Sequence, residues 1–182
     1  MPSDFTIRPV TLDEVPALER LIAASARGLS QGDYTTAQIE AAIGTAWGVD
    51  TELIRDRTYF VVEGAGAPAA VACGGWSRRK TLFGSDQQPG RESALLDPAV
   101  DAARIRAFFV DPAWARRGIG RLLLDRCEAE ARAAGFTATE LMATLPGERL
   151  YAAAGYVAGE RIHHPLAGGL TIEFVAMRKR LA

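Results

Sequence analysis

The stretch RRGIGR, residues 116–121, places two glycines and three arginines where a helix is about to begin. The first amides of a helix need hydrogen-bond acceptors, and a Ser, Thr, Asp or Asn side chain usually supplies one. No such residue lies between Asp111 and Asp125. A phosphate group could accept these hydrogen bonds instead, because helix N-termini attract anions and glycines let the backbone approach closely. The stretch therefore predicts a phosphate-binding loop, although a plain turn with solvated arginines has the same spacing.

Two other phosphate-binding motifs do not fit this stretch. The P-loop signature GxxxxGK[ST] is absent from the chain. The dinucleotide fingerprint GxGxxG has its first two glycines, but its third position is Leu123, which is too bulky for close packing of the helix. Glu140 follows in the middle of an expected strand, which is the wrong place to bind a ribose. The pattern therefore disfavours a nicotinamide-dependent enzyme.

Cysteine and histidine offer little further chemistry. Cys73 and Cys127 are the only cysteines, and they form no CxxC motif. We interpret Cys127 as a core thiol, because a reactive cysteine needs a polar and electropositive site. His163 and His164 are adjacent, so on a strand they point to opposite faces and do not readily chelate one ion. We expect no metal site.

Composition sets the broad class of the protein. A chain of 182 residues is long enough for a single domain, residues 1–182, with a sizeable core. A net charge of -1 gives no basic field to gather nucleic acid or an anionic membrane. The start of the sequence lacks a signal-peptide pattern, no apolar run reaches the ~18 residues of a membrane span, and there is no disulfide framework. These features predict a soluble, cytoplasmic protein that binds neither nucleic acid nor membrane.

The first half of the chain predicts a strand, two helices and two more strands. The strand is Phe5–Pro9. The capping pair Thr11 and Glu14 then predicts a helix that runs to about Arg27. The first residue of this helix is not fixed by the sequence, because Pro16 would remove a backbone hydrogen bond if the helix began at Thr11. Residues 35–47 predict a second helix with the apolar stripe Ile39, Ile43 and Trp47. Residues 58–64 and 68–76 then predict a β-hairpin. The polar stretch 77–103 is unusually long for a loop, which makes it a candidate substrate-facing segment.

The second half alternates strands and helices. Residues 103–110 predict a strand, and residues 121–134 predict an amphipathic helix that a glycine at position 135 ends. A strand at 137–145, a short helix at 148–154 and a hairpin of strands at 156–166 and 170–181 follow. The order of elements predicts a mixed α/β sheet whose central β-α-β unit is a parallel crossover.

The run VDPAWARRGIGRLLL, residues 110–124, resembles the acyl-CoA-binding motif of the GNAT superfamily of N-acetyltransferases, and the order of elements is similar over nearly the whole chain. The resemblance implies a GNAT-like α/β fold: a mixed, mostly antiparallel central sheet with a parallel β-α-β crossover at the cofactor site and flanking helices. The family motif is Gln/Arg-x-x-Gly-x-Gly/Ala, and Ala115 departs from it at the first position. In the family, the loop amides hold the pyrophosphate of coenzyme A.

The resemblance also implies that the end of the preceding strand pairs with the pantetheine arm, and that its backbone N–H groups polarise the thioester carbonyl. The cofactor-binding residues that it implies are Phe108, Phe109, Val110, Arg116, Arg117, Gly118, Ile119, Gly120 and Arg121.

A second stretch, LPGERLYAAAGY, is similar to another motif of the family, and the match implies that Tyr151 is the general acid. Amine attack on a thioester expels a thiolate, and a phenol with a pKa of about 10 can protonate it. A packing role for Tyr151 is the alternative. Many relatives carry an asparagine ahead of this helix, where this chain has Leu145-Pro146-Gly147, so that contact is not transferred.

The reaction implied by the resemblance is acetyl transfer from acetyl-CoA, the co-substrate, to an amine by direct attack without a covalent enzyme intermediate. The acceptor, a small-molecule or peptide amine, is not identified by the sequence. Glu140, Glu173 and Asp97 are candidate bases, although a structural role is the better prediction for each. Dimerisation is common in the family, so a homodimer is one expectation. The alternative function is a non-catalytic acyl-CoA-binding or sensor module on the same fold.

Overall fold

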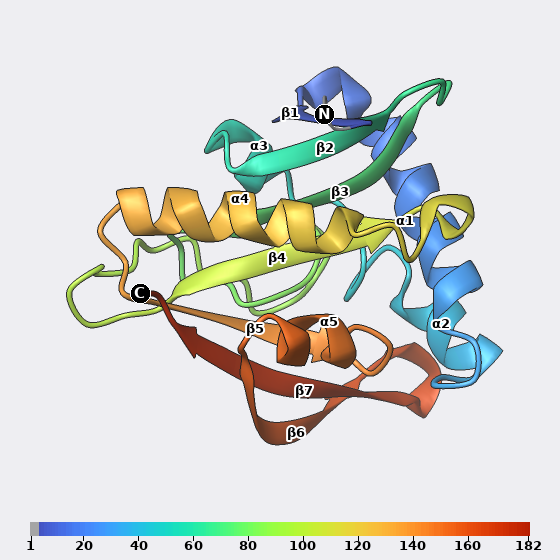
Figure 1. Cartoon of the computed structure of the whole chain (residues 1–182). Helices are drawn as coiled ribbons and strands as arrows, with labels where there is room; N and C mark the ends of the chain where they lie inside the picture. Colours follow the sequence, from blue (N-terminus) through green and yellow to red (C-terminus); the bar gives the residue numbers. More distant parts are fainter. Residues whose placement is uncertain (1–3) are drawn as a thin grey trace.

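The computed structural model describes residues 4–182, and a seven-stranded sheet runs through it in the order β1-β2-β3-β4-β5-β7-β6 (Figure 1). The strands are β1 (Phe5–Pro9), β2 (Tyr59–Gly64), β3 (Ala70–Ser77), β4 (Ala103–Val110), β5 (Ala138–Thr144), β6 (Val157–Pro165) and β7 (Thr171–Arg180). Neighbouring strands are antiparallel except for β4 and β5, which are parallel and joined by a helix. The predicted mixed sheet with one parallel crossover is confirmed.

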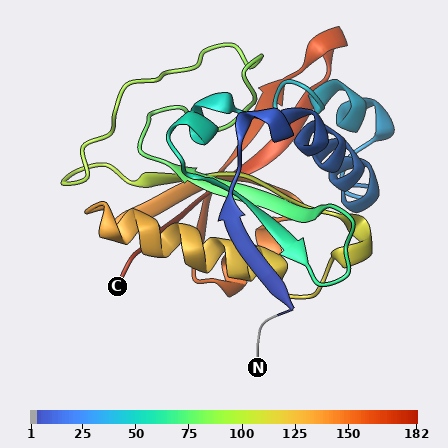
Figure 2. The same ribbon diagram turned by 90° about the horizontal axis from the view of Figure 1, so that it is seen from above.

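Helices cover both faces of this sheet. They are α1 (Val15–Leu29), α2 (Thr36–Ala42), α3 (Thr51–Arg55), α4 (Ile119–Ala133) and α5 (Glu148–Ala153). Helices α1 to α3 lie on one face, and α4 and α5 lie on the other (Figure 2). Each face buries its own hydrophobic cluster, with Leu123 and Cys127 of α4 in one and Leu18 and Ile22 of α1 in the other. Within residues 4–182, none of the helices has the length and apolar character needed to cross a membrane.

The helices between α1 and β2 differ from the prediction. The apolar stripe predicts one helix through Trp47, but α2 ends at Ala42. Ile43 has extended backbone angles (φ -63°, ψ 128°) and Gly44 has a φ of 90°, so the chain turns there and brings Trp47 back beside Ile43. Helix α3 is absent from the prediction because its five residues are too few to show a helical period.

The start of α1 is tied to strand β1 by an ion pair. A 3-10 turn at Leu12–Glu14 precedes α1, and it places Pro16 in the first turn of the α-helix, where no hydrogen bond is lost. Glu14 accepts a hydrogen bond from the Thr11 amide (2.9 Å), as the predicted capping pair requires. The Arg8 guanidinium donates to both Glu14 oxygens, at 2.7 and 3.0 Å. This hydrogen bonding lowers the pKa of Glu14 from 4.5 to about 2.

Glu14→Gln should therefore destabilise the protein at neutral pH and much less in acid. Above the unfolded-state pKa the wild-type carboxylate is ionised in both states, and only the folded state pairs it with Arg8. As the pH falls from 4.5 toward 2, the unfolded chain takes up the proton first, so the stabilisation is lost. Urea unfolding of both proteins at about pH 6 and about pH 3 measures this. A difference in unfolding free energy that is the same at both pH values would contradict the assignment.

A buried cluster of charged residues holds the long loop between β3 and β4 against the sheet. Asp50, just before α3, accepts hydrogen bonds from Arg91 (2.8 Å) and from Arg106 of β4 (2.9 Å). Arg106 also donates to the carbonyl oxygens of Thr81 (3.2 Å) and Gly84 (2.8 Å) in the loop. Burial alone would raise the pKa of Asp50, but the hydrogen bond from Arg91 and the charges of Arg106 and Arg91 outweigh burial and lower it. The position of the loop therefore depends on ion pairs inside the protein.

Candidate active site

Strands β4 and β5 pair only near their beginnings. Ala103 and Arg104 pair with Thr139 and Glu140, and the described ladder between the two strands ends there. The rest of β4 has an open edge, whose backbone groups need hydrogen-bond partners from elsewhere. The sheet is therefore split where the sequence predicts a pantetheine arm.

A β-bulge in β4 lies beside this split. The register with β3 shifts between Cys73 and Gly75, and the extra residue on β4 falls at Ala107 and Phe108. Ala107 has a φ of 55°, and its carbonyl oxygen lies 3.1 Å from the buried hydroxyl of Tyr59. A bulge bends the strand that carries it and re-aims its side chains. The Tyr59 contact holds this bend in place.

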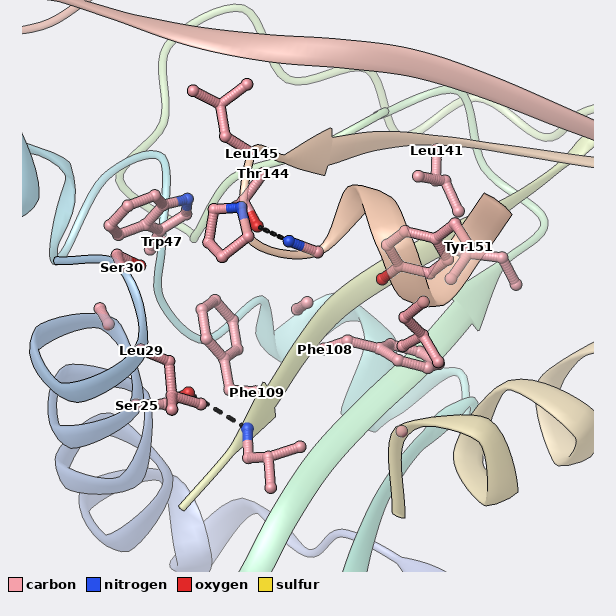
Figure 3. A pocket seen from close by; sticks show the side chains of 18 of the residues that line it. Ser25, Leu29, Ser30, Trp47, Phe108, Phe109, Leu141, Thr144, Leu145 and Tyr151 are labelled. Atoms are coloured by element: carbon pink, nitrogen blue, oxygen red, sulfur yellow. Dashed lines mark hydrogen bonds between the residues drawn. The ribbon is translucent and has the colours of Figure 1, made fainter. Parts of the chain in front are cut away.

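A cavity of ≈ 770 Å³ occupies the split between β4 and β5 (Figure 3). This volume is in the range of pockets that bind small molecules and cofactors. Phe108 and Tyr151 line one side of it, whereas Trp47, Leu29 and Phe109 line the other (Figure 3). The two sides contain residues of the two separate hydrophobic clusters. The cavity therefore connects the α4 face of the sheet with the α1 face.

The N-terminus of α4 opens into this cavity without a side-chain cap. The N-cap residue is Gly118, whose φ of 79° lies in the region that favours glycine. A Cβ atom at this position would meet nothing within 4 Å, so the backbone conformation requires the glycine and packing does not. The predicted uncapped N-terminus is confirmed, with the helix running over Ile119–Ala133 where the sequence predicts 121–134.

Position 120 requires a glycine for a different reason, which is close packing. A Cβ atom on Gly120 would lie 2.9 Å from the Leu150 side chain, so this glycine lets α5 approach the first turn of α4. The side chain of Ile119 is buried in the core, which leaves its backbone as the part that can face a ligand.

The three arginines of the loop are all exposed. Arg116 and Arg121 line the cavity, and Arg121 also pairs with Asp125 (2.8 Å). Arg117 lies outside the cavity wall and stacks on the Trp114 ring, with 4.6 Å from the guanidinium carbon to the ring centroid. Two of the three predicted arginines are therefore placed where they could meet an anion at the helix N-terminus.

Tyr151 of α5 projects its hydroxyl group into the cavity (Figure 3). Its ring packs against Phe108 and Tyr156, with centroid distances of 6.2 and 5.7 Å. No hydrogen bond joins its hydroxyl to any of residues 4–182 whose interactions are described. Burial raises the pKa of Tyr151 above its ordinary value of 10. The ring has the packing role, and the hydroxyl remains a protonated group that faces the cavity.

The predicted strand residues divide between the two edges of β4. The Asp111 amide donates to β3, and the Val110 amide donates to the Ser25 hydroxyl on the opposite edge (3.1 Å; Figure 3). Phe109 faces β3 with its backbone and contributes its ring to the α1 side of the cavity.

The candidate bases lie outside the described cavity wall. Glu140 pairs with Arg104, and Glu173 lies 3.3 Å from the Arg161 guanidinium. Asp97 accepts a backbone hydrogen bond within its own loop. Each of these carboxylates has a structural partner, as the sequence predicts.

The histidines lie side by side on β6. In the antiparallel register of β6 with β7, His163 lies opposite Glu173 and His164 lies opposite Ile172. The His164 ring packs edge-on against Phe83, with 4.8 Å between centroids. Within residues 4–182, no group of three or more His, Cys, Asp or Glu side chains could hold a metal ion.

The α1 side of the cavity was not predicted from the sequence. It includes Trp47, which the sequence places on a helical stripe, and Leu82 and Phe83 from the long loop. The unusual length of that loop was the one sequence signal for this side of the site, and three of its residues, Leu82, Phe83 and Gly84, line the cavity. Asp33, which follows α1, is the single carboxylate among the described residues of the wall.

Comparisons with known proteins agree with this geometry. Residues 25–156 match the model of the acetyltransferase (GNAT) family. No curated protein sequence matches the chain significantly.

Solved structures match the fold along almost the whole chain. A GCN5-related N-acetyltransferase from Rhodopseudomonas palustris has a TM-score of 0.72 at 21% identity, covering 98% of this chain and 97% of that one. The protein yncA from Salmonella typhimurium, solved with its cofactor acetyl-CoA, has a TM-score of 0.62 at 15% identity, covering 99% and 95%. PaiA N-acetyltransferase from Thermoplasma acidophilum, in complex with coenzyme A, has a TM-score of 0.60 at 11% identity, covering 97% and 98%.

Proposed function

Because the chain belongs to the GNAT family of acetyltransferases, we propose that it transfers the acetyl group of acetyl-CoA to a primary amine. The observation that carries this proposal is one cavity that contains three features: an uncapped helix N-terminus, an open strand edge and the Tyr151 hydroxyl. Acetyl-CoA, the co-substrate of this family, has a chemical part for each of them. Its diphosphate suits the amides of α4, and its pantetheine amides suit the edge of β4.

In the proposed reaction the amine nitrogen attacks the thioester carbonyl carbon, and the carbon–sulfur bond breaks. Tyr151 gives its proton to the departing thiolate, and the proton that the nitrogen loses as the amide forms returns through water to the Tyr151 oxygen. The phenol of Tyr151 is protonated at neutral pH and so has a proton to give, although burial, which raises its pKa, also makes it a weaker acid. The substrate ammonium must lose a proton before the amine attacks. We propose that water in the cavity, and not a carboxylate, accepts this proton.

The direct test is the release of free thiol from acetyl-CoA with a panel of primary amines. We expect amine-dependent release at a rate well above hydrolysis in the absence of amine. If calorimetry shows that the protein binds coenzyme A but none of the amines stimulates thiol release, the protein is the non-catalytic module and the proposed reaction is wrong.

Substitution of the N-cap glycine of α4 should weaken coenzyme A binding. Gly118→Ala places a side chain at a φ of 79°, where an L-residue is strained by roughly 1–2 kcal/mol. The loop would relax away from the conformation that aims its amides into the cavity, so we expect the Kd for coenzyme A to rise about 10-fold. Calorimetric titration measures this change.

Gly66→Ala is the matched control for that variant. Gly66 also has a φ of 79°, and a Cβ atom added there would meet nothing within 4 Å, but it lies in the β2–β3 hairpin away from the cavity. Both variants should lose similar stability, and only Gly118→Ala should lose affinity. Equal affinities of the two variants for coenzyme A would show that the α4 N-terminus does not hold it.

A further inference from the structure

The α1 side of the cavity is a preformed apolar chamber. Its wall, here called the acceptor chamber, is mainly apolar, and two serines, Ser25 and Ser30, also lie on this side (Figure 3). The apolar residues are Leu29, Trp47, Phe83, Phe109, Met142 and Phe174. These residues come from α1, the loops around α2 and α3, the long loop and strands β4, β5 and β7. Since α4 and α5 form the proposed cofactor side, the chamber is the space left for the acceptor (Figure 3).

Ring packing and hydrogen bonds hold part of the chamber wall. Phe83, Phe174 and His164 form a ring cluster, with centroids 5.5 Å apart for the two phenylalanines and 4.8 Å for Phe83 and His164. Arg106 donates hydrogen bonds to the carbonyl oxygens of Thr81 and Gly84, on either side of Phe83 along the chain. A wall held by such contacts favours ligands that match its shape.

The charges around the cavity are distributed unevenly. The cationic side chains in the described wall are Arg116, Arg121 and Arg149, and all three belong to the loop before α4, to α4 or to α5. The acceptor chamber itself contains no cation. His164, behind its wall, has a pKa that burial lowers from 6.5, so its ring adds no positive charge at neutral pH.

The one anionic group of the wall lies at the chamber's rim. Asp33 is exposed, and its carboxylate makes no hydrogen bond or ion pair with any of the residues described in the structure. An ammonium group that approaches the chamber would be attracted to it, whereas a carboxylate or phosphate would be repelled and would find no cationic partner in the chamber.

Resting on the proposed acetyl transfer, we infer that the acceptor is a monoamine carried on an apolar body, with no carboxylate beside the amine. The apolar walls bind the body, the absence of a cation excludes amino acids, and Asp33 favours the single ammonium group at the rim. A polyamine is disfavoured because its second cation would enter the apolar chamber unpaired.

A series of matched amines tests this inference. 2-Phenylethylamine, phenylalanine and phenylalanine amide share one ring and one amine, and they differ in the group beside the amine. We expect kcat/KM for 2-phenylethylamine to exceed that for phenylalanine by at least about 10²-fold, because a buried, unpaired carboxylate is costly. Phenylalanine amide should fall between them, and ethylamine and spermidine should both be poor.

Two variants separate specificity from general damage. Asp33→Asn should lower kcat/KM for 2-phenylethylamine about 2- to 5-fold through KM, and this loss should disappear at high salt. Leu29→Arg adds a cation at the exposed end of α1, on the chamber wall. It should lower the preference for 2-phenylethylamine over phenylalanine about 10-fold, whereas simple structural damage would lower both rates alike.

The outcomes distinguish this inference from the proposed function. If phenylalanine or spermidine is the best acceptor, or if Leu29→Arg leaves the preference unchanged, the inferred acceptor class is wrong while acetyl transfer stands. If no amine in the series increases thiol release while coenzyme A binds, the proposed function itself is wrong.

Discussion

Tyr151→Phe is expected to lower kcat for acetyl transfer about 10²-fold and to leave the Kd for coenzyme A unchanged. The substitution removes the one hydroxyl proton that faces the cavity from α5 and keeps the ring that packs against Phe108 and Tyr156. The loss is at the low end for acid catalysis because a thiolate is already a fair leaving group. Steady-state kinetics, with calorimetry for the coenzyme, measures both effects.

The pH profile gives a second readout of the same group. Burial raises the pKa of Tyr151, so the acid stays protonated throughout the usual assay range. The wild-type rate should rise with pH as the substrate ammonium loses its proton, and it should not fall again below about pH 10.

Tyr156→Phe is the matched control for Tyr151→Phe. Tyr156 is also buried and neighbours Tyr151, but its hydroxyl lies 2.7 Å from the Thr139 hydroxyl and outside the cavity wall. This variant should lose about 1 kcal/mol of stability and keep its kcat. If the two variants had the same kcat, the acid role of Tyr151 would be wrong.

Asp50→Asn is expected to cause the largest loss of stability. Asp50 and Arg106 are both 1% exposed in their side chains, and the carboxylate also pairs with Arg91. Removing its charge leaves the Arg106 cation buried without a counter-ion, and breaking such a pair costs about 3–5 kcal/mol. For a protein of this size we expect Tm to fall by roughly 6–20 °C.

Asp86→Asn provides the comparison for this effect. Asp86 is an exposed carboxylate of the same loop that accepts a hydrogen bond from the Thr51 amide (3.0 Å), and an asparagine oxygen can still accept it. The unfolding free energy of the Asp86→Asn variant should differ from that of the wild type by less than about 0.5 kcal/mol. A loss below about 1 kcal/mol in Asp50→Asn would show that the buried pair does not hold the loop.

The regular elements were predictable where local signals agreed. Strand β1 was predicted at its observed bounds, and the glycines at 135 and 155 follow the ends of α4 and α5 as predicted. The helix predicted at residues 35–47 is present as Thr36–Ala42 with its Thr35 and Gln38 capping pair, but the prediction was wrong beyond Ala42, because a positive φ at Gly44 interrupts an apolar period that continues through Trp47. A stripe of apolar residues shows which side chains are buried, but it does not show that one helix carries them.

The two sides of the site differed in how far the sequence could specify them. The α4 side is built from one contiguous stretch and α5, so the missing cap pointed to Gly118 and the family resemblance of the second motif pointed to Tyr151, and both residues line the cavity. The acceptor chamber brings together Trp47, Phe83 and Phe174 from distant parts of the chain. Such a wall depends on long-range packing and on the buried Asp50 cluster, which leave no local pattern in the sequence.

The central claim is that the uncapped N-terminus of α4 holds the diphosphate of coenzyme A beside the open edge of β4. The structure of the protein in complex with coenzyme A tests it most directly. We predict diphosphate oxygens within about 2.7–3.2 Å of the first backbone nitrogens of α4, and the pantetheine arm alongside Phe108. A complex in which the diphosphate lies elsewhere, with those nitrogens bound only to water, would contradict the claim.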